Sequence, residues 1–304
     1  MIHTKSFIFT LILTVLLLGC TRESAIQTAD KVNSIVHLGV MADCQYADQP
    51  DRGKRLYRRS VLKLDSAVNE FNASNLDHVI HLGDFIDTGP ENYDIVLQKQ
   101  QNLKIPMTHV LGNHDFSVPD SLKHKVPSYL GLLKRYFSFY IKSWKFIVLD
   151  GNDVSLHAWS KNSPKYIESK NIFEKLYSDQ PDYNGALGKT QLVWLKHELE
   201  KSELKNEHVI ILCHFPVLPE GSHHQLWNWK EIVTLLNNYQ CVKAWLNGHN
   251  HAGGYDKRNG IHYVTFKGMV DSSENSFAKL ILSDEVIKII GWGREKSRAL
   301  ILKK

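Results

Sequence analysis

The chain has 304 residues, of which 43% are hydrophobic and 23% are charged. These proportions are typical of a soluble globular protein, and they exclude a disordered tail protein, a collagen and a multi-span membrane protein. The formal net charge is only +5, which does not indicate a dedicated nucleic-acid-binding face, so we expect no nucleic-acid partner. The sixteen histidines are the unusual feature, because several of them stand beside Asp, Asn or Gly.

The N-terminus is predicted to be a targeting segment. Lys5 precedes an apolar run over residues 7–18, which is too short to span a bilayer and is typical of a secretory signal peptide. Cys20 ends a Leu-Leu-Gly-Cys sequence that resembles the lipobox of bacterial lipoproteins, in which the cysteine is acylated. We therefore expect a signal peptide at 1–19, a lipid on Cys20, a polar tether at 20–34, and a periplasmic or cell-surface protein anchored to a membrane. The alternatives are an ordinary signal peptide with a chance cysteine, or a short anchor.

Three further cysteines, Cys44, Cys213 and Cys241, lie in or beside apolar runs. An odd number in an exported protein leaves at least one thiol unpaired. We expect buried free thiols, and the absence of any Cys-x-x-Cys spacing excludes a zinc ribbon.

Hydrophobic periodicity predicts strands that alternate with helices along most of the chain. The predicted strands are 35–42, 78–83, 107–111, 209–213 and 242–246, a hairpin of 137–141 with 145–150, and later strands at 261–266, 278–282 and 286–291; the predicted helices are 55–71, 92–103, 189–204 and 227–236. This alternation indicates an α/β sheet. Residues 151–188 are polar and aromatic, and we expect a long excursion near the site. No linker or repeat follows the tether, so 35–304 is predicted to be a single domain.

Side chains that can bind a metal follow five of the predicted strands. They are Asp43, Asp84, Asn113 with His114, His214, and His249 with His251. Ligands bind beyond the carboxyl ends of strands in open α/β sheets, and carboxylate, amide and imidazole groups together suit Mn, Fe or Zn. Any one of these residues would usually be structural, but five at the same kind of position indicate a metal centre.

These residues stand in motifs that resemble those of the calcineurin-like metallophosphoesterases. The motifs are Asp43-x-Gln45, Gly83-Asp84, Gly112-Asn113-His114-Asp115, His214-x-Pro216 and Gly248-His249-x-His251, in family order. The resemblance implies a four-layer αββα sandwich, with two central mixed sheets flanked by helices, and two divalent metal ions between loop ends.

Gln45 stands where most of the family has histidine. The segment 39–48 around it resembles the branch of manganese-dependent ADP-ribose/CDP-alcohol diphosphatases, and so do 184–188 and 248–255. The alternative is a generic family member that has lost a ligand and with it some or all activity. An amide oxygen is a harder ligand than imidazole, so we expect Mn²⁺ to be favoured over Zn²⁺, with Mg²⁺ or iron as alternatives.

The resemblance also implies a role for each site residue. Asp84 would bridge the two ions; Asp43, Gln45 and His251 would complete the first site, and Asn113, His214 and His249 the second. His114 would face the substrate as a catalytic acid or electrostatic stabiliser, and Asp115 would orient it through the other ring nitrogen. Two cations would clamp the attacking and leaving oxygens and activate a water held between them.

Other side chains are weaker candidates for substrate contact. Tyr46 is adjacent to Gln45, while Arg58, Arg59 and Trp227 could contact a phosphate or a base. We expect His78 and His81 to pack in the sheet, and His223 and His224 to be solvated loop residues rather than substrate contacts. Asp87 is equally consistent with a turn and with a role in orienting the loop.

The sequence thus predicts a metal-dependent hydrolase that cleaves the diphosphate of a nucleotide such as ADP-ribose or a CDP-alcohol. The products would be a nucleoside monophosphate and a phosphorylated second group. A cyclic-nucleotide phosphodiesterase or broad phosphoesterase on the same scaffold is the first alternative. A non-catalytic nucleotide-binding lipoprotein is the second, and a nuclease the third.

Overall fold

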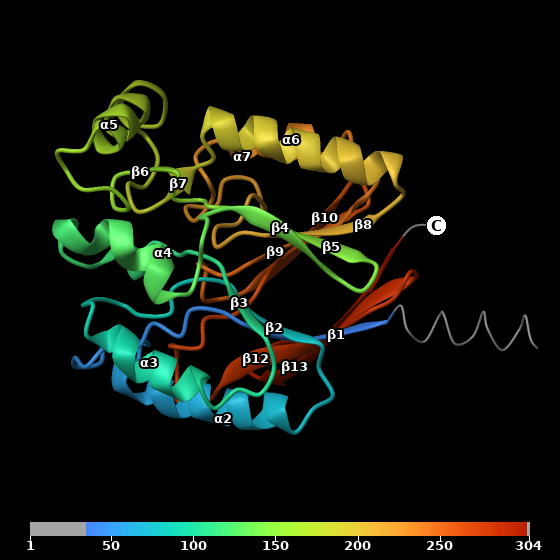
Figure 1. The fold of residues 1–304 in the computed structure, drawn as a ribbon, viewed down its shortest axis with the longest axis horizontal. Coiled ribbons are helices and arrows are strands. Elements are labelled where there is room, and N and C mark those ends of the chain that lie inside the picture. Colours follow the sequence, from blue (N-terminus) through green and yellow to red (C-terminus); the bar gives the residue numbers. More distant parts are fainter. Residues whose placement is uncertain (1–34, 303–304) are drawn as a thin grey trace, which may run out of the picture. The chain divides into compact units, whose positions relative to one another are not determined.

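The computed structural model describes residues 35–302. The predicted signal peptide and tether, with Cys20, lie outside the described residues. No helix in the described part of the chain combines the length and apolar character needed to cross a membrane. Residues from Val36 onward form one compact unit, which contains two six-stranded sheets and the helices that cover them (Figure 1).

The first sheet has the strand order β14-β13-β12-β1-β2-β3. Its strands are β1 (Val36–Met41), β2 (His78–His81), β3 (Met107–His109), β12 (Ser276–Leu282), β13 (Val286–Gly293) and β14 (Arg298–Ile301). β1, β2 and β3 are parallel, whereas β12 pairs antiparallel with β1 in the register Val36 opposite Leu282. The C-terminal strands thus extend the sheet beyond β1, on the side opposite β2 and β3.

The second sheet has the strand order β10-β11-β9-β8-β5-β4. Its strands are β4 (Phe137–Ile141), β5 (Trp144–Val148), β8 (His208–Leu212), β9 (Val242–Asn247), β10 (Gly254–Arg258) and β11 (Ile261–Thr265). The four central strands are parallel, and an antiparallel strand closes each edge. The predicted hairpin of β4 and β5 is confirmed.

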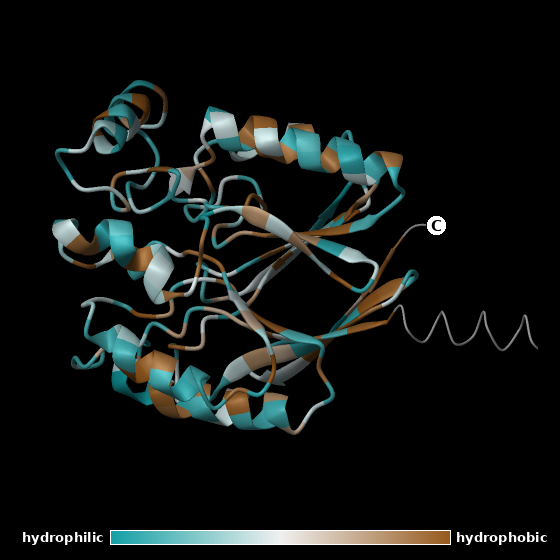
Figure 2. Ribbon diagram, viewed as in Figure 1, coloured by the Kyte–Doolittle hydropathy of each residue, from teal (hydrophilic) through white to brown (hydrophobic). Residues whose placement is uncertain are grey.

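The two sheets face each other across an apolar core. Alternation in β8 shows how the layers form, because Ile210 and Leu212 point into this core while Val209 and Ile211 point to the helices outside. The helices α2 (Ser60–Asn72) and α3 (Asn92–Gln100) cover the first sheet, and α6 (Lys189–Leu204) and α7 (Trp229–Leu236) cover the second. Their apolar sides face the sheets (Figure 2). The predicted αββα sandwich is confirmed.

The excursion at 151–188 contains regular structure that the sequence analysis did not predict. It holds α5 (Pro164–Leu176) and a small sheet of β6 (Val154–Ser155) with β7 (Gly185–Ala186). Ser163 caps α5 by accepting a hydrogen bond from the Tyr166 amide, and proline occupies the first turn. Both features are start signals of a helix, so the sequence did contain the information.

Several smaller expectations can be compared with the structure. The three cysteines are buried and unpaired, as predicted. The predicted helix at 55–71 begins with a 3-10 turn, Tyr57–Arg59, before α2, and β10 and β14 were not predicted.

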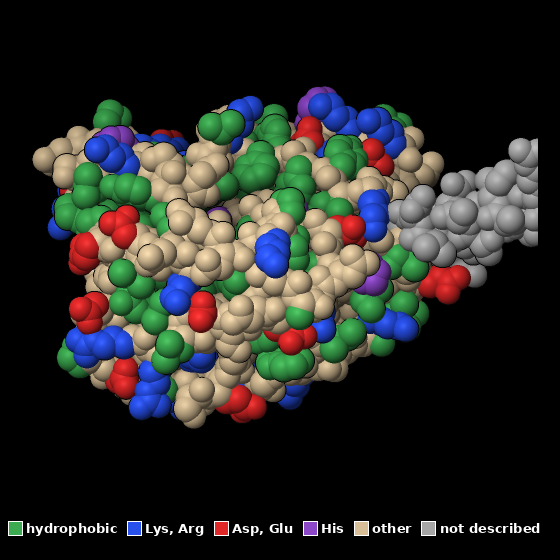
Figure 3. Space-filling view, turned by 60° about the horizontal axis from the view of Figure 1, so that its bottom comes forward, with side chains coloured by type: hydrophobic (Ala, Val, Ile, Leu, Met, Phe, Trp, Pro, Cys, Tyr) green, Lys and Arg blue, Asp and Glu red, His purple; other side chains and the backbone are tan. Residues whose placement is uncertain are grey.

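On the face shown in Figure 3, basic and acidic side chains are intermixed, and no broad basic stripe crosses the described residues there.

Candidate metal centre

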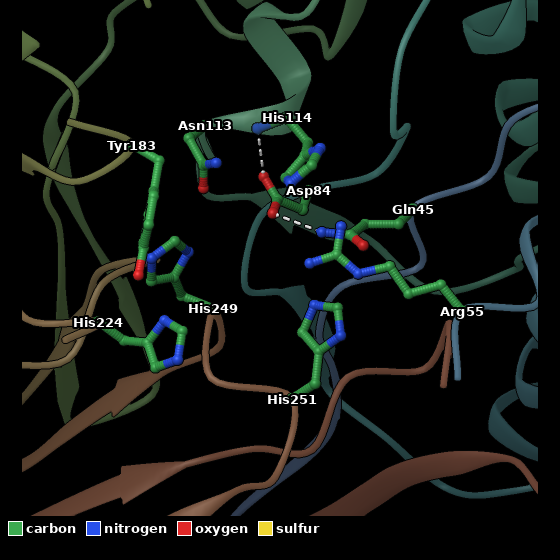
Figure 4. Close-up of a pocket in the computed structure, with 9 residues that line it drawn as sticks. All are labelled: Gln45, Arg55, Asp84, Asn113, His114, Tyr183, His224, His249 and His251. Atoms are coloured by element: carbon green, nitrogen blue, oxygen red, sulfur yellow. Dashed lines mark hydrogen bonds between the residues drawn. The ribbon is translucent and has the colours of Figure 1, made fainter. Parts of the chain in front are cut away.

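The predicted metal-binding residues gather at one end of the sandwich, on the loops that follow the carboxyl ends of β1, β2, β8 and β9 and on the loop after β3. Most of them line a cavity of about 360 Å³, while Asp43 and His214 are fully buried and do not reach it. Its walls are formed by Gln45, Arg55, Asp84, Asn113, His114, Tyr183, His224, His249 and His251 (Figure 4). The sequence motifs therefore converge, because parallel strands deliver their carboxyl ends to the same end of a sheet.

The backbone at four of these residues is left-handed. The φ angles are +51° at Asp43, +43° at Gln45, +59° at Asp84 and +67° at His249. Positive φ is uncommon for residues other than glycine and costs free energy, so it persists where the surrounding structure imposes it, often at functional sites. Here it turns the chain sharply after each strand.

Two glycines let the loops approach each other closely. A Cβ atom on Gly112 would lie 2.1 Å from Asp84 Oδ1, and one on Gly248 would lie 2.6 Å from Asp43 Oδ2. Real Cβ contacts do not reach such distances, so any side chain at either position would displace a carboxylate of the site.

Asp84 occupies the middle of the cluster and is fully buried. Its Oδ1 accepts a hydrogen bond from the His114 amide at 2.8 Å, and its Oδ2 accepts one from Gln45 Nε2 at 2.9 Å. The same Oδ2 lies 3.2 Å from His214 Nε2. The carboxylate therefore faces residues assigned to both predicted metal sites.

Two imidazole nitrogens face each other in the second half of the cluster. His214 Nδ1 lies 2.8 Å from the Leu82 carbonyl oxygen, so Nδ1 is a donor and Nε2 points into the cluster. His249 Nε2 lies 2.9 Å from Asn184 Oδ1, so Nδ1 is bare. The two inward nitrogens are 3.2 Å apart, and Asn113 Oδ1 is 3.2 Å from His214 Nε2. Acceptor atoms that converge in this way call for a cation between them, either a proton or a metal ion.

The first half of the cluster has the same character. His251 Nδ1 lies 3.0 Å from Asp271 Oδ1, so this ring donates to the carboxylate and turns its bare Nε2 toward Asp43, 3.6 Å away. Gln45 Oε1 is buried and accepts no hydrogen bond in the described part of the chain. This unpaired oxygen is a further lone pair that a bound cation would satisfy.

The electrostatics of the buried groups also favour positive charge. Burial by itself would lower the pKa of His214, but the neighbouring Asp84 and Asp43 carboxylates outweigh it and raise that pKa to about 9, so Nε2 holds a proton at neutral pH unless a metal ion replaces it. Burial raises the pKa of Asp84, yet His214 and His114 together hold it well below its usual range. Burial and the charge of His214 keep the pKa of His249 well below its usual value, so this ring is a neutral ligand.

His114 lies at the wall of the cavity, beside the cluster. Its Nδ1 is 3.1 Å from the carbonyl oxygen of Asp87 and 3.1 Å from Oδ1 of the same residue. Burial alone would lower the pKa of His114, but Asp84 and Asp87 raise it. Arg55 Nη1 approaches Asp87 Oδ1 at 3.6 Å. Asp87 therefore orients the ring, and the reading of Asp87 as a plain turn residue is not needed.

The predicted role of Asp115 differs from what the structure shows. Its Oδ2 accepts hydrogen bonds from the amides of Gly112 and Asp84 at 2.9 and 3.1 Å, and its Oδ1 accepts one from the Phe85 amide at 2.9 Å. Burial and the Asp84 charge raise the pKa of Asp115 to about 7. Asp115 thus ties two loops together instead of orienting the His114 ring, because its carboxylate faces backbone donors.

The weaker candidates for substrate contact lie elsewhere. Tyr46 packs in the core against α2 and α3, and Arg58 pairs with Asp48 at 2.6 Å in solvent. Arg59 is exposed at the start of α2. Trp227 packs against the excursion, and its Nε1 donates to the Pro181 carbonyl oxygen at 2.9 Å. None of these four lines the described cavity.

Residues that were not predicted as substrate contacts line the cavity or hold its histidines. Arg55 and Tyr183 reach the cavity, and His224 lines it although a solvated position was expected. Asn184 and Asp271 hold His249 and His251. Arg55 lies only three residues before Arg58 in a basic segment. The charge pattern therefore identified the segment but not which of its arginines faces the cavity. His78 and His81 pack in the sheet as predicted.

Two facing mixed sheets with carboxylate, amide and imidazole ligands gathered at one end define the metallophosphoesterase class of hydrolases. The chain belongs to the calcineurin-like phosphoesterase family, whose sequence model matches residues 36–253.

Comparison with individual proteins shows which members of the family this chain resembles. The manganese-dependent ADP-ribose/CDP-alcohol diphosphatase of Mus musculus is 28% identical, over 91% of this chain and 96% of that protein. The protein of the same name from Oryza sativa subsp. japonica is 30% identical, over 77% of this chain and 83% of that protein. A dimetal phosphatase from Danio rerio superposes with a TM-score of 0.80 at 25% identity, over 88% of this chain and 99% of that structure. The resemblance inferred from the motifs is confirmed.

Proposed function

We propose that this protein is a manganese-dependent hydrolase of nucleoside diphosphate compounds such as ADP-ribose and CDP-alcohols. It would release a nucleoside monophosphate and a phosphorylated second group. The observation that carries the proposal is the convergence of ring nitrogens from His214, His249 and His251 with the Asp43 and Asp84 carboxylates. The similarity to diphosphatases over nine-tenths of the chain supports the choice of substrate.

The residues present fit two divalent ions. Asp43, Gln45 and His251 would hold one, Asn113, His214 and His249 the other, and Asp84 both. The unpaired Gln45 oxygen supports this assignment, as does the group of Asp84, His214 and His249, whose ligand atoms all lie within 4.8 Å of one another. The oxygen-rich first half favours Mn²⁺ over Zn²⁺. When bound, the ions supply charge to neutralise the phosphates and to activate water near neutral pH.

The chain's own groups then act on the substrate. His114 lies at the cavity wall with Nδ1 held by Asp87, so its Nε2 is the atom that can donate a proton to the leaving phosphate oxygen. The raised pKa keeps that proton available near neutral pH. Arg55 contributes a permanent positive charge beside an anionic substrate.

A substrate panel tests the proposal directly. The purified, metal-free chain is supplied with Mn²⁺ and assayed on ADP-ribose, CDP-choline, cyclic AMP and bis(p-nitrophenyl) phosphate. We expect the highest kcat/KM with the first two, and loss of activity with a chelator. Preference for the last two would replace the diphosphatase by a phosphodiesterase. Two bound ions without turnover of any substrate would indicate a binding protein, and equal activity with zinc alone would reject the manganese preference.

We also propose that the protein is exported and lipid-anchored through Cys20. The support is the short apolar run followed by Leu-Leu-Gly-Cys. Expression in a bacterial host with labelled palmitate should label the wild type and leave Cys20→Ala unlabelled, while Cys44→Ala, at a buried cysteine, serves as control. Equal labelling of wild type and Cys20→Ala would contradict the anchor.

A further inference from the structure

A short segment, residues 268–272, lies against the first half of the metal centre and is called the strap below. The Val270 amide donates a hydrogen bond to the Asp43 carbonyl oxygen at 2.9 Å. The Asp271 carboxylate accepts from His251 Nδ1 at 3.0 Å. The strap therefore touches two of the proposed ligands, and its position sets the direction in which the His251 ring presents its bare nitrogen.

One buried lysine holds the strap from the side of α2. Lys63 is only 6% exposed, and its Nζ donates to the carbonyl oxygens of Met269, of Asp271 at 3.4 Å and of Ser272 at 2.9 Å. Among the described residues Lys63 takes part in no ion pair, and the Asp271 charge acts on it only from beyond ion-pair distance. Burial lowers the pKa of Lys63 to about 8, so at neutral pH the amine still carries three protons to donate.

A buried ammonium without a counter-ion is costly, so its retention calls for a role. We propose that Lys63 is a positioning residue for the first metal site, which holds the strap so that Asp271 keeps the His251 ring aligned on its ion. The inference rests on the proposed metal-dependent function, but it concerns the affinity for the ion and not the turnover. Carboxylates that orient metal-bound histidines are worth about 10–100-fold in metal affinity.

The chain offers a matched control lysine that packs against the same helix. Lys279 of β12 also reaches α2, where its Nζ lies 3.0 Å from Glu70 Oε1 and 3.3 Å from Ser74 Oγ. Lys279 is partly buried, and its polar contacts in the described part of the chain are with Glu70 and Ser74 and not with the strap, so its replacement reports the general cost of losing a lysine at the α2 surface.

The test measures Mn²⁺ binding to the purified metal-free chain by calorimetry, with electron paramagnetic resonance to distinguish the sites. Lys63→Met should weaken one site by about 10–100-fold and leave the other unchanged. Lys279→Met should bind both ions as the wild type does. Asp271→Asn should weaken the same site, and the double variant Lys63→Met/Asp271→Asn should be no weaker than the weaker single variant.

Several results would overturn the inference. They are wild-type affinity in Lys63→Met, equal weakening of both sites, and additive losses in the double variant. Lys63→Gln keeps a shorter donor and should give an intermediate affinity, which preserves the test if the methionine variant does not fold. A wild type that binds two ions in the pattern above but hydrolyses no diphosphate would reject the proposed function and leave the role of Lys63 standing.

Discussion

His214 and His249 in one half of the metal centre are held differently from His251 in the other. A backbone carbonyl and an amide side chain hold the first two rings, through Leu82 and Asn184. The His251 ring instead donates to the Asp271 carboxylate. The His214 side chain is fully buried, whereas that of His251 is 11% exposed.

The difference has a physical consequence. Neutral partners fix the orientation of a ring without adding charge, while a carboxylate also makes the ring a stronger base and a better ligand. The second half is thus built for fixed geometry. The first half, which contains Gln45 in place of an imidazole, depends on charge from Asp271 and on the strap that carries it.

Replacement of Asp84 tests whether one carboxylate serves both halves of the metal centre. Asp84→Asn removes the charge next to both halves, so we expect loss of both ions and a fall in kcat on the order of 10³-fold or more, which corresponds to several kcal/mol. Asp43→Asn should lose only the first ion. Metal analysis and turnover measure both effects, and an Asp84→Asn chain that retains two ions would refute the shared role.

His114 should separate chemistry from metal binding in either half. His114→Ala should keep both ions and lose turnover by about 10²–10⁴-fold, the usual range for an acid–base group. His197→Ala, at an exposed position on α6, is the control. Loss of an ion from His114→Ala would place this residue among the ligands.

Asn184 tests whether an uncharged hydrogen-bond partner holds a ligand of the second half in place. Asn184→Ala removes the acceptor of His249 Nε2, and we expect the second site to bind Mn²⁺ about 10–100-fold more weakly. The first site should be unchanged, which is the reverse of the result expected for Asp271→Asn. If both variants weakened the same site, the division into halves would fail.

Gln45 tests which metal ion the first half prefers. Gln45→His introduces a softer ligand, so we expect zinc affinity at the first site to rise by about tenfold, equivalent to ~1.4 kcal/mol. Competition between Zn²⁺ and Mn²⁺ in the variant and the wild type measures the shift. An unchanged preference would mean that Gln45 does not reach the ion.

Lys63 should have the smallest effect on activity but a distinct pH signature in stability. Its pKa is about 8 in the folded protein and about 10.4 when unfolded. The unfolded chain therefore holds this proton more tightly between those values, and unfolding takes up a proton there. Relative to Lys63→Met, the wild type should gain up to ~2 kcal/mol of unfolding free energy as the pH rises from 8 to 10. Parallel denaturant titrations would show it, and a constant difference would mean that Lys63 titrates outside this range.

The cluster of proposed metal ligands could be predicted because each residue lies within a short contiguous motif. Apolar runs identify the strands, and five of these strands are followed within a few residues by Asp43, Asp84, Asn113, His214 and His249. The carboxyl ends of parallel strands meet, so the convergence follows from local pattern and fold class. The Ser163–Pro164 start of α5 was equally local and was missed only because the surrounding composition is polar.

The residues that support the ligands could not be predicted in this way. Asn184 meets His249 across 65 positions, and Lys63 meets the strap across more than 200. No periodicity marks such pairs, because they depend on how loops from different strands pack together at the end of the sandwich. The sequence by itself determined the layers, the family and the residues that gather in the proposed metal centre. Only the tertiary structure decided that Arg55 rather than Arg58 faces the cavity, and that Asp87 rather than Asp115 orients His114, since each choice depends on the direction of one side chain after a sharp turn.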